Sequence, residues 1–311
     1  MNTEVTQGDS RPTALHVVDG IDLTGKTCVI TGASSGLGRE SARALASARA
    51  HVVLAARNLD ALAGVRDRIN AEVPDAQTSI VDLDLTSLTA IRDAAAKVAD
   101  VAPTIHVLMN NAGVMFTPFS RTEDGFEIQF GTNHLGHFEL TKLLRRQLEA
   151  ARGARVVNLS SDGHHLGDID LQDPNWQRRE YDKFSAYGAA KTANVLHAVE
   201  LDRRLRDKGV RAYAVHPGMV ATKLTRHMSR EDVVAVGERA DTRAVDVVTA
   251  EHGAATQVWA AVSPELADQG GVYLADCEVR SDVAPYAVDR DRAGELWALS
   301  ESLCASRDDA I

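Results

Sequence analysis

The chain has little cysteine and no excess of basic charge. Only three of its 311 residues are cysteine, and Cys28, Cys277 and Cys304 form neither a CxxC pair nor a set with metal-ligand spacing. This argues against a disulfide framework and is typical of a protein of the reducing cytoplasm. The formal net charge is −10, from 34 basic and 44 acidic residues. Nucleic-acid binders concentrate positive charge, so we expect no nucleic-acid partner.

Long apolar runs and targeting signals are also missing. No run approaches the roughly 18 residues that a membrane-spanning helix needs. Residues 1–20 lack the basic-then-apolar order of a signal peptide. We therefore expect a soluble, cytoplasmic protein without a membrane span. The hydrophobic fraction of 44% and the charged fraction of 25% are ordinary for a globular protein.

Short apolar runs alternate with longer amphipathic segments along the chain. Each run is about one strand long, is rich in β-branched residues and lacks strict alternation, as is typical of strands covered on both faces. The runs span 27–31, 51–55, 78–82, 105–109, 155–159, 210–215 and 271–274. The alternation predicts a Rossmann-type α/β fold, a doubly wound parallel sheet of seven strands with helices on both faces. We expect one domain over 25–311, after an N-terminal extension of residues 1–24.

A glycine-rich turn joins the first predicted strand to the first predicted helix, with the sequence TGASSGLG at 31–38. Small residues let the backbone approach a pyrophosphate, and the helix N-terminus supplies N–H donors and a favourable dipole. The alternative is a tight turn that merely connects strand and helix. The position of the turn favours dinucleotide binding, with contacts from Gly32, Ser34, Ser35, Gly36, Leu37 and Gly38.

The second predicted strand ends at Arg57 and Asn58. An acidic residue there would hydrogen-bond an adenosine ribose and repel a 2′-phosphate, whereas a guanidinium suits a phosphate. This favours NADP(H) over NAD(H) as cofactor. The alternative is that Arg57 is a solvated surface cation.

Tyr187 and Lys191 lie four positions apart on a predicted helix, so the phenol and the ammonium share one face. A tyrosine with its ordinary pKa of about 10 is a poor acid or base at neutral pH, and a nearby ammonium lowers that pKa. Ser160 and Ser161 follow the strand at 155–159, where a serine can donate a hydrogen bond to a substrate oxygen. YxxxK alone is a common accident. Together with the glycine loop, it indicates an active site.

These motifs resemble the short-chain dehydrogenase/reductase superfamily over roughly residues 22–280, together with NNAG at 110–113 and HPGMVAT at 216–222. The resemblance implies that Ser161 is the catalytic serine and that Tyr187 and Lys191 are the acid/base pair. It also implies that Asn133 completes the catalytic set, its backbone holding a water that links Lys191 to solvent. The remaining cofactor contacts that it implies are Asp84, Leu85, Asn111, Ala112, Gly113, Tyr187, Lys191, Pro217, Gly218, Val220 and Thr222.

Within that superfamily, AARN, NHLGHF, SSDGHH and VHPG are similar to the retinol dehydrogenase and WW-domain oxidoreductase branch. This implies an apolar small molecule as substrate, interconverted between an alcohol and a ketone or aldehyde. The missing N-terminal anchor puts a retinoid-like membrane substrate in doubt. Residues 223–250 occupy the position of the family's substrate lid. The 26 positions from Ser161 to Tyr187 exceed the usual gap, which predicts a surface excursion beside the active site.

Many relatives form dimers or tetramers through the helices that carry Asn133 and Tyr187, so the resemblance implies a homodimer or homotetramer that the long segment could obstruct. Two other functions stay open: an inactive nucleotide-sensing scaffold, and a reductase of a carbon–carbon double bond. The intact Asn133, Ser161, Tyr187 and Lys191 set argues against the scaffold. His134 and His137 lie three apart, but no third ligand is evident, so we expect no metal site.

Overall fold

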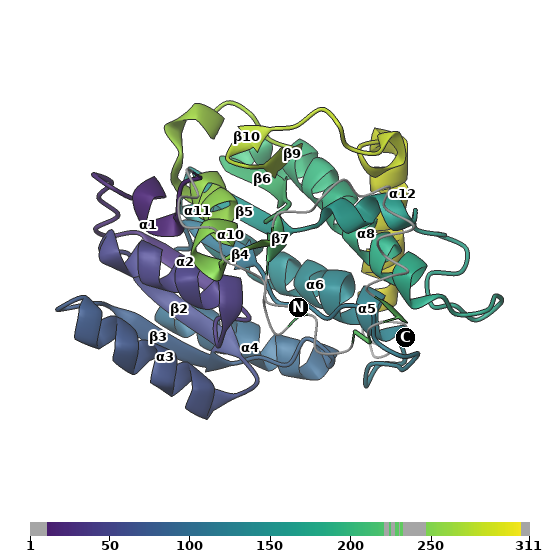
Figure 1. Cartoon of the computed structure of the whole chain (residues 1–311), viewed down its shortest axis with the longest axis horizontal. Coiled ribbons are helices and arrows are strands. Elements are labelled where there is room, and N and C mark those ends of the chain that lie inside the picture. Colours follow the sequence, from purple (N-terminus) through teal and green to yellow (C-terminus); the bar gives the residue numbers. More distant parts are fainter. Residues whose placement is uncertain (1–10, 221–223, 225–227, 230, 233–246, 306–311) are drawn as a thin grey trace.

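The computed structural model describes residues 11–220, 224, 228–229, 231–232 and 247–305. Its centre is an eight-stranded sheet in the order β10-β9-β6-β5-β4-β1-β2-β3 (Figure 1). The strands are β1 (Thr27–Thr31), β2 (His51–Ala56), β3 (Thr78–Asp82), β4 (Val107–Asn110), β5 (Ala154–Leu159), β6 (Val210–Val215), β9 (Val272–Ala275) and β10 (Glu278–Val279). Two further short strands, β7 (Met219–Val220) and β8 (Val247–Val248), pair separately.

The seven predicted strands are present and parallel, but the predicted number of strands was wrong by one. The additional strand, β10, pairs antiparallel with β9, with Glu278 opposite Ala275. Asp276 and Cys277 form the turn between them and have positive φ angles of 52° and 57°. A two-residue hairpin turn with positive φ at both positions matches the right-handed twist of the strands that it joins.

Helices cover both faces of the sheet (Figure 1). One face carries α1 (Ala14–Val17), α2 (Gly36–Ser47), α3 (Leu59–Glu72), α10 (Ala250–Gly253) and α11 (Ala255–Val262). The other carries α4 (Leu88–Val101), α5 (Ile128–Phe130), α6 (Gly136–Leu143), α7 (Arg145–Ala150), α8 (Lys183–Leu205) and α12 (Arg290–Cys304). No helix in the described ranges combines the length and the apolar character needed to cross a membrane.

Two hydrophobic cores lie on opposite sides of the sheet, and successive strand residues alternate between them. In β1, Val29 belongs to one core, whereas Cys28 and Ile30 belong to the other. In β5, Val156 likewise belongs to the first core and Val157 to the second. Side chains alternate along a strand, so a strand with helices on both faces is apolar at every position. This explains why the parallel strands appear in the sequence as continuous apolar runs.

The helical segment that carries Asn133 contains a π-turn. Residues Gly131–Leu135 connect α5 to α6, and the N–H of Gly136 donates to the carbonyl of Gly131, five residues earlier. Such turns are rare and occur frequently at functional sites. The turn lies on the same side of the sheet as α8, the helix that carries Tyr187 and Lys191.

Candidate active site

The glycine loop between β1 and α2 lies directly against the segment that follows β4. A Cβ atom on Gly32 would lie 2.8 Å from the Cα of Ala112, and Gly32 has a φ of +67°. A Cβ on Gly38 would lie 2.5 Å from the carbonyl oxygen of Gly32 and 2.6 Å from Nδ2 of Asn111. Only glycine fits either position without displacing backbone, so the backbone of the loop is left bare.

Thr31 holds these two segments together. Its Oγ1 accepts hydrogen bonds from the backbone N–H groups of Asn111 at 2.9 Å and Ala112 at 3.0 Å. In return, Nδ2 of Asn111 donates to the carbonyl of Thr31 at 2.7 Å. Ser35 is the N-cap of α2, and its side chain makes no capping hydrogen bond in the described structure. The first-turn N–H groups of α2 therefore keep the capacity to bind an anion.

A cavity of about 690 Å³ opens at this edge of the sheet. Its lining includes predicted cofactor residues from four segments: Gly32, Ser34, Ser35, Gly36, Leu37, Arg57, Asn58, Asp84, Leu85, Asn111, Ala112 and Gly113. It extends to Leu159, at the end of the strand that precedes Ser160 and Ser161. The structure thus joins the predicted dinucleotide site to the predicted catalytic side of the sheet.

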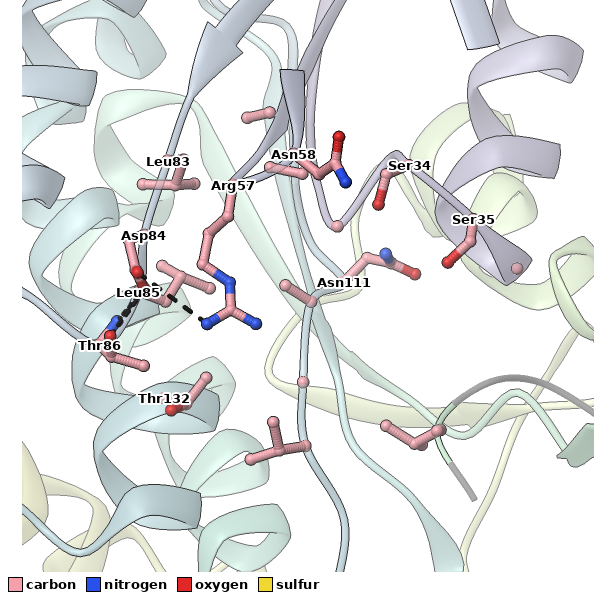
Figure 2. A pocket seen from close by; sticks show the side chains of 18 of the residues that line it. Ser34, Ser35, Arg57, Asn58, Leu83, Asp84, Leu85, Thr86, Asn111 and Thr132 are labelled. Atoms are coloured by element: carbon pink, nitrogen blue, oxygen red, sulfur yellow. Dashed lines mark hydrogen bonds and ion pairs between the residues drawn. The ribbon is translucent and has the colours of Figure 1, made fainter. Parts of the chain in front are cut away.

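Arg57 extends into the middle of this cavity (Figure 2). Its Nη1 lies 4.0 Å from Oδ2 of Asp84, and its side chain is 62% exposed. Oδ1 of Asp84 accepts from the N–H of Thr86 at 2.9 Å and from its hydroxyl at 2.7 Å. Asn58 uses its Oδ1 to cap α3 by accepting from the N–H of Ala61. Arg57 is therefore an exposed cation within the cavity, with the Asp84 carboxylate at the limit of ion-pair distance.

Of the predicted contacts after β6, Val220 lies next to the glycine loop, and Pro217, Gly218 and Val220 are outside the lining of the cavity. A Cβ on Gly253 would lie 2.5 Å from Cγ2 of Val220 and 2.9 Å from Cδ2 of Leu37, so these two side chains approach each other there. Gly218 has a φ of +82°, beside Pro217. Thr222 lies outside the described residues, as does most of the predicted lid at 223–250.

Tyr187, Lys191 and Ser161 come together at the amino-terminal part of α8. Tyr187 and Lys191 are each 4% exposed, and the side chain of Ser161 hydrogen-bonds the Tyr187 phenol. Nζ of Lys191 donates to the carbonyl of Leu159 at 2.9 Å and lies 5.6 Å from the centre of the Tyr187 ring. A Cβ on Gly163 would lie 2.7 Å from Cε1 of Tyr187, so this glycine lies against the phenol ring.

The expected lowering of the Tyr187 pKa was wrong for this structure. Burial raises the pKa of Tyr187 to about 12, and the hydrogen bond with Ser161 opposes that rise only in part. Burial also lowers the pKa of the Lys191 ammonium to about 8. Desolvation penalises whichever form is charged, so it favours a neutral phenol and a less basic amine. Tyr187 is therefore a protonated phenol at neutral pH.

Asn133 lies in the π-turn and fastens it to the loop after β4. Its Oδ1 accepts from the N–H of Val114 at 2.8 Å, and its Nδ2 donates to the carbonyl of Val114 at 2.9 Å. A Cβ on Gly113 would lie 3.1 Å from Oδ1 of Asn133 and 3.9 Å from Nζ of Lys191. The structure thus brings the side chains of Asn133 and Lys191 close to Gly113.

A second polar group near Ser161 was not predicted. Oδ1 of Asp162 accepts from the hydroxyl of Tyr273 at 2.9 Å, and its Oδ2 lies 3.2 Å from Nε2 of His216. The N–H of Asp162 donates to Nδ1 of the same imidazole at 3.2 Å. This group ties together the ends of β5, β6 and β9. Its members lie in the SSDGHH and VHPG motifs and in the last parallel strand, but no spacing in the sequence links them.

An apolar wall surrounds Tyr187 and was also not predicted. The ring of Phe116 lies 4.7 Å from that of Phe184 and 5.0 Å from that of Tyr187, centre to centre. Met115, Leu166 and Met228 pack against this cluster. Phe116 has a φ of +51°, and Oε1 of Gln129 accepts its N–H at 2.9 Å. A bulky residue in that conformation is a strained position, of a kind that clusters at functional sites.

The long segment between Ser161 and Tyr187 folds back against α5. Its Trp176 is 8% exposed, with the guanidinium of Arg179 3.8 Å from the ring centre. The Tyr181 hydroxyl donates to Oε1 of Glu127 at 2.9 Å.

Three residues that follow Ser161 could in principle hold a metal ion. Asp162, His164 and His165 place possible ligand atoms within 4.8 Å of one another. However, Nδ1 of His164 lies 2.8 Å from the Ser161 carbonyl and its Nε2 accepts from the N–H of Ala284, so both ring nitrogens have protein partners.

Comparisons with known proteins agree with one another on the kind of protein that this chain resembles. The sequence model of the short chain dehydrogenase family matches residues 26–233. "Retinol dehydrogenase 13" of Homo sapiens is 40% identical over 90% of this chain and 85% of its own length. "WW domain-containing oxidoreductase" of Pongo abelii is 38% identical over 96% of this chain and 73% of its own length. The crystal structure of an uncharacterized protein from Mycobacterium paratuberculosis superposes with a TM-score of 0.74 at 35% identity, covering 95% of this chain and 98% of that one.

Proposed function

The chain belongs to the short-chain dehydrogenase family, in the branch that includes the retinol dehydrogenases, and is an NAD(P)-dependent oxidoreductase acting on CH–OH donors. From this premise we propose that it uses NADP(H) to interconvert an apolar alcohol with a ketone or aldehyde, with Tyr187 as the acid/base. One observation carries the proposal: the buried pair of Tyr187 and Ser161 lies beside Lys191, which donates to the carbonyl of Leu159, a residue that lines the glycine-bordered cavity.

The cavity suits a dinucleotide because the glycine loop borders it with backbone. A Cβ on Gly32, which lines the cavity, or on Gly38 would collide with Ala112 or Asn111, so neither position can carry a side chain. The N-terminus of α2 offers N–H donors, and Ser34 and Ser35 line the same space. These residues would hold the pyrophosphate, and Asn111, Ala112, Gly113 and Lys191 would lie on the nicotinamide side. When bound, the cofactor supplies the hydride.

The protein residues then handle the oxygen and its proton. In the direction of reduction, Ser161 and Tyr187 donate hydrogen bonds to the substrate carbonyl oxygen. Tyr187 transfers its proton to that oxygen as negative charge develops there. A phenol that is protonated at neutral pH is the form that this step requires. The Lys191 cation favours the phenolate that remains, because opposite charges attract strongly in a buried site.

The preference for NADP(H) rests on Arg57. Its exposed guanidinium lies over the cavity after β2, where a 2′-phosphate can accept paired hydrogen bonds. Asp84, 4.0 Å away, is the acidic group nearest to it in Figure 2. A dianionic phosphate would compete with that carboxylate for the guanidinium. Neither Arg57 nor Asn58 would accept a hydrogen bond from a ribose diol in the way that a carboxylate does.

The apolar wall supports an apolar substrate. Phe116 and Phe184 pack around Tyr187, with Met115 and Met228 at the border of the cluster. A substrate whose carbonyl reaches Tyr187 therefore places its substituents against aromatic and thioether groups. Burial of apolar surface contributes roughly 25 cal/mol per Å², so such a site favours apolar ketones and aldehydes over polar ones.

The substitution Tyr187→Phe tests the proposal. It removes the proton donor while retaining the ring, so we expect turnover of an apolar ketone with NADPH to fall by about 100- to 10,000-fold. The Kd for NADPH, measured by fluorescence, should stay within about twofold. Tyr213→Phe is the matched control, because it removes another buried phenol hydroxyl, which donates to the carbonyl of Leu266. Retained turnover in the Tyr187 variant would refute the assignment of Tyr187 as the acid/base. With an unsaturated ketone as substrate, a product that has lost its carbon–carbon double bond and kept its carbonyl group would refute the reaction class.

A further inference from the structure

His137 is a buried histidine of α6 to which the proposed mechanism gives no role. Its side chain is 1% exposed, and both of its ring nitrogens meet a polar atom. Nδ1 lies 2.9 Å from the carbonyl oxygen of Asn133, and Nε2 lies 2.9 Å from Oγ1 of Thr31. One imidazole therefore bridges the π-turn and the strand that leads into the glycine loop.

The partners of His137 determine which of its nitrogens carries the proton. A carbonyl oxygen can only accept, so Nδ1 is the donor to Asn133. Thr31 Oγ1 already accepts two backbone N–H groups and has one hydrogen left to donate. The nearer acceptor for that hydrogen is Nε2 of His137 at 2.9 Å, since the carbonyl of Met109 lies at 3.4 Å. The imidazole is therefore neutral, in agreement with a pKa that burial lowers to about 4.

The bond to Asn133 joins the His137 side chain to the π-turn itself. Within that turn the N–H of Gly136 donates to the carbonyl of Gly131, five residues earlier, instead of the four of a regular α-helix. Asn133 lies inside this turn, and the His137 imidazole donates to its carbonyl from the first turn of α6.

We propose that His137 is a positioning residue that fixes Asn133 and the segment 111–113 beside Lys191. The inference rests on the proposed function. The bond to Asn133 holds the turn whose Asn133 side chain lies, like Lys191, close to Gly113, and so supports turnover. The bond to Thr31 holds the hydroxyl that anchors Asn111 and Ala112, two residues that line the cavity, and so supports cofactor binding.

Two substitutions separate these bonds. His137→Asn places an amide nitrogen near the former position of Nδ1 and retains the donor to Asn133. His137→Gln places an amide oxygen near the former position of Nε2 and retains the acceptor for Thr31. We expect His137→Asn to raise the Kd for NADPH about tenfold with kcat within about twofold of wild type. We expect His137→Gln to lower kcat about tenfold with the Kd within about twofold.

The same two substitutions at His197 serve as matched controls. His197 is 3% exposed and lies in α8, where its ring contacts those of Phe138 and Trp297. We expect the His197 variants to lower the unfolding midpoint without changing kcat or Kd. Parallel losses of kcat and affinity in both His137 variants, in proportion to their loss of stability, would overturn the inference.

Nucleotide binding and carbonyl turnover are measured separately. Wild-type protein that binds NADPH but reduces no carbonyl contradicts the proposed function. In that case the Kd values of His137→Asn and His137→Gln for NADPH still test whether His137 supports the cofactor site, because a binding measurement does not require turnover. Equal Kd values for the two variants would overturn that link.

Discussion

The structure leaves no space for a methyl group at position 38, so a substitution there tests the proposed role of the glycine loop in cofactor binding. In Gly38→Ala the new Cβ would lie 2.5 Å from the Gly32 carbonyl oxygen and 2.6 Å from Nδ2 of Asn111. Neither neighbour is free to move, since the N–H of Gly32 donates to the carbonyl of Ala55 at 2.8 Å and Nδ2 of Asn111 donates to that of Thr31 at 2.7 Å.

The cost of this methyl group exceeds the gain that alanine brings to a helix. Overpacking costs about 1–3 kcal/mol, and a strained or lost hydrogen bond of Asn111 costs about 1 kcal/mol more. Replacing a helical glycine by alanine returns up to about 1 kcal/mol. We therefore expect a net loss of about 1–3 kcal/mol. NADPH binding should weaken at least tenfold, because Gly32 and Asn111 line the cavity.

Gly64→Ala is the control for this experiment. Gly64 also lies inside a helix, α3, but a Cβ there would meet nothing within 4 Å. This variant should gain about 0.4–1 kcal/mol, chiefly through the unfolded chain, and should bind NADPH like wild type. Urea unfolding and fluorescence titration of both variants measure the two effects. Equal stability and affinity in the two variants would refute the account of the loop.

Two further predictions concern the buried histidines and Gly163. Burial lowers the pKa of His137 to about 4 and that of His197 to about 3, from an ordinary value of 6.5. The unfolded chain therefore takes up these protons first, and stability falls as the pH drops below 6.5 toward the folded pKa values, by about 2 kcal/mol for each histidine at pH 5. A urea midpoint that is the same at pH 7.5 and pH 5 would contradict this. Gly163→Ala places a methyl group 2.7 Å from the Tyr187 ring and should lower kcat at least tenfold while sparing the Kd for NADPH, whereas unchanged kcat would show that the ring is not held there.

The parallel sheet could be predicted because its pattern is local. Each parallel strand is a run of apolar residues, since neighbours such as Val156 and Val157 face different cores. β10 could not be predicted in this way. It contains two exposed residues, and its turn uses Asp276 and Cys277 where hairpins of this type favour Asn-Gly or Asp-Gly.

The parts of the site that escaped prediction depend on contacts between distant residues. Thr31 and His137 are 106 positions apart, and Asp162 and Tyr273 are 111 positions apart. No local spacing encodes such pairs. The pKa of Tyr187 shows the same limit, because the sequence reveals the ammonium of Lys191 four residues away but not the burial that raises this pKa.

The most direct test of the central claim is a fluorescence titration of the purified protein with NADPH and NADH, comparing wild type with Arg57→Ala. We expect wild type to bind NADPH more tightly than NADH and the variant to lose most of this difference. A lost guanidinium–phosphate contact corresponds to about 1.5–3 kcal/mol, or roughly 10- to 150-fold in Kd. Selectivity that is unchanged in the variant would contradict the role of Arg57. Binding of neither nucleotide would contradict the proposed enzyme itself.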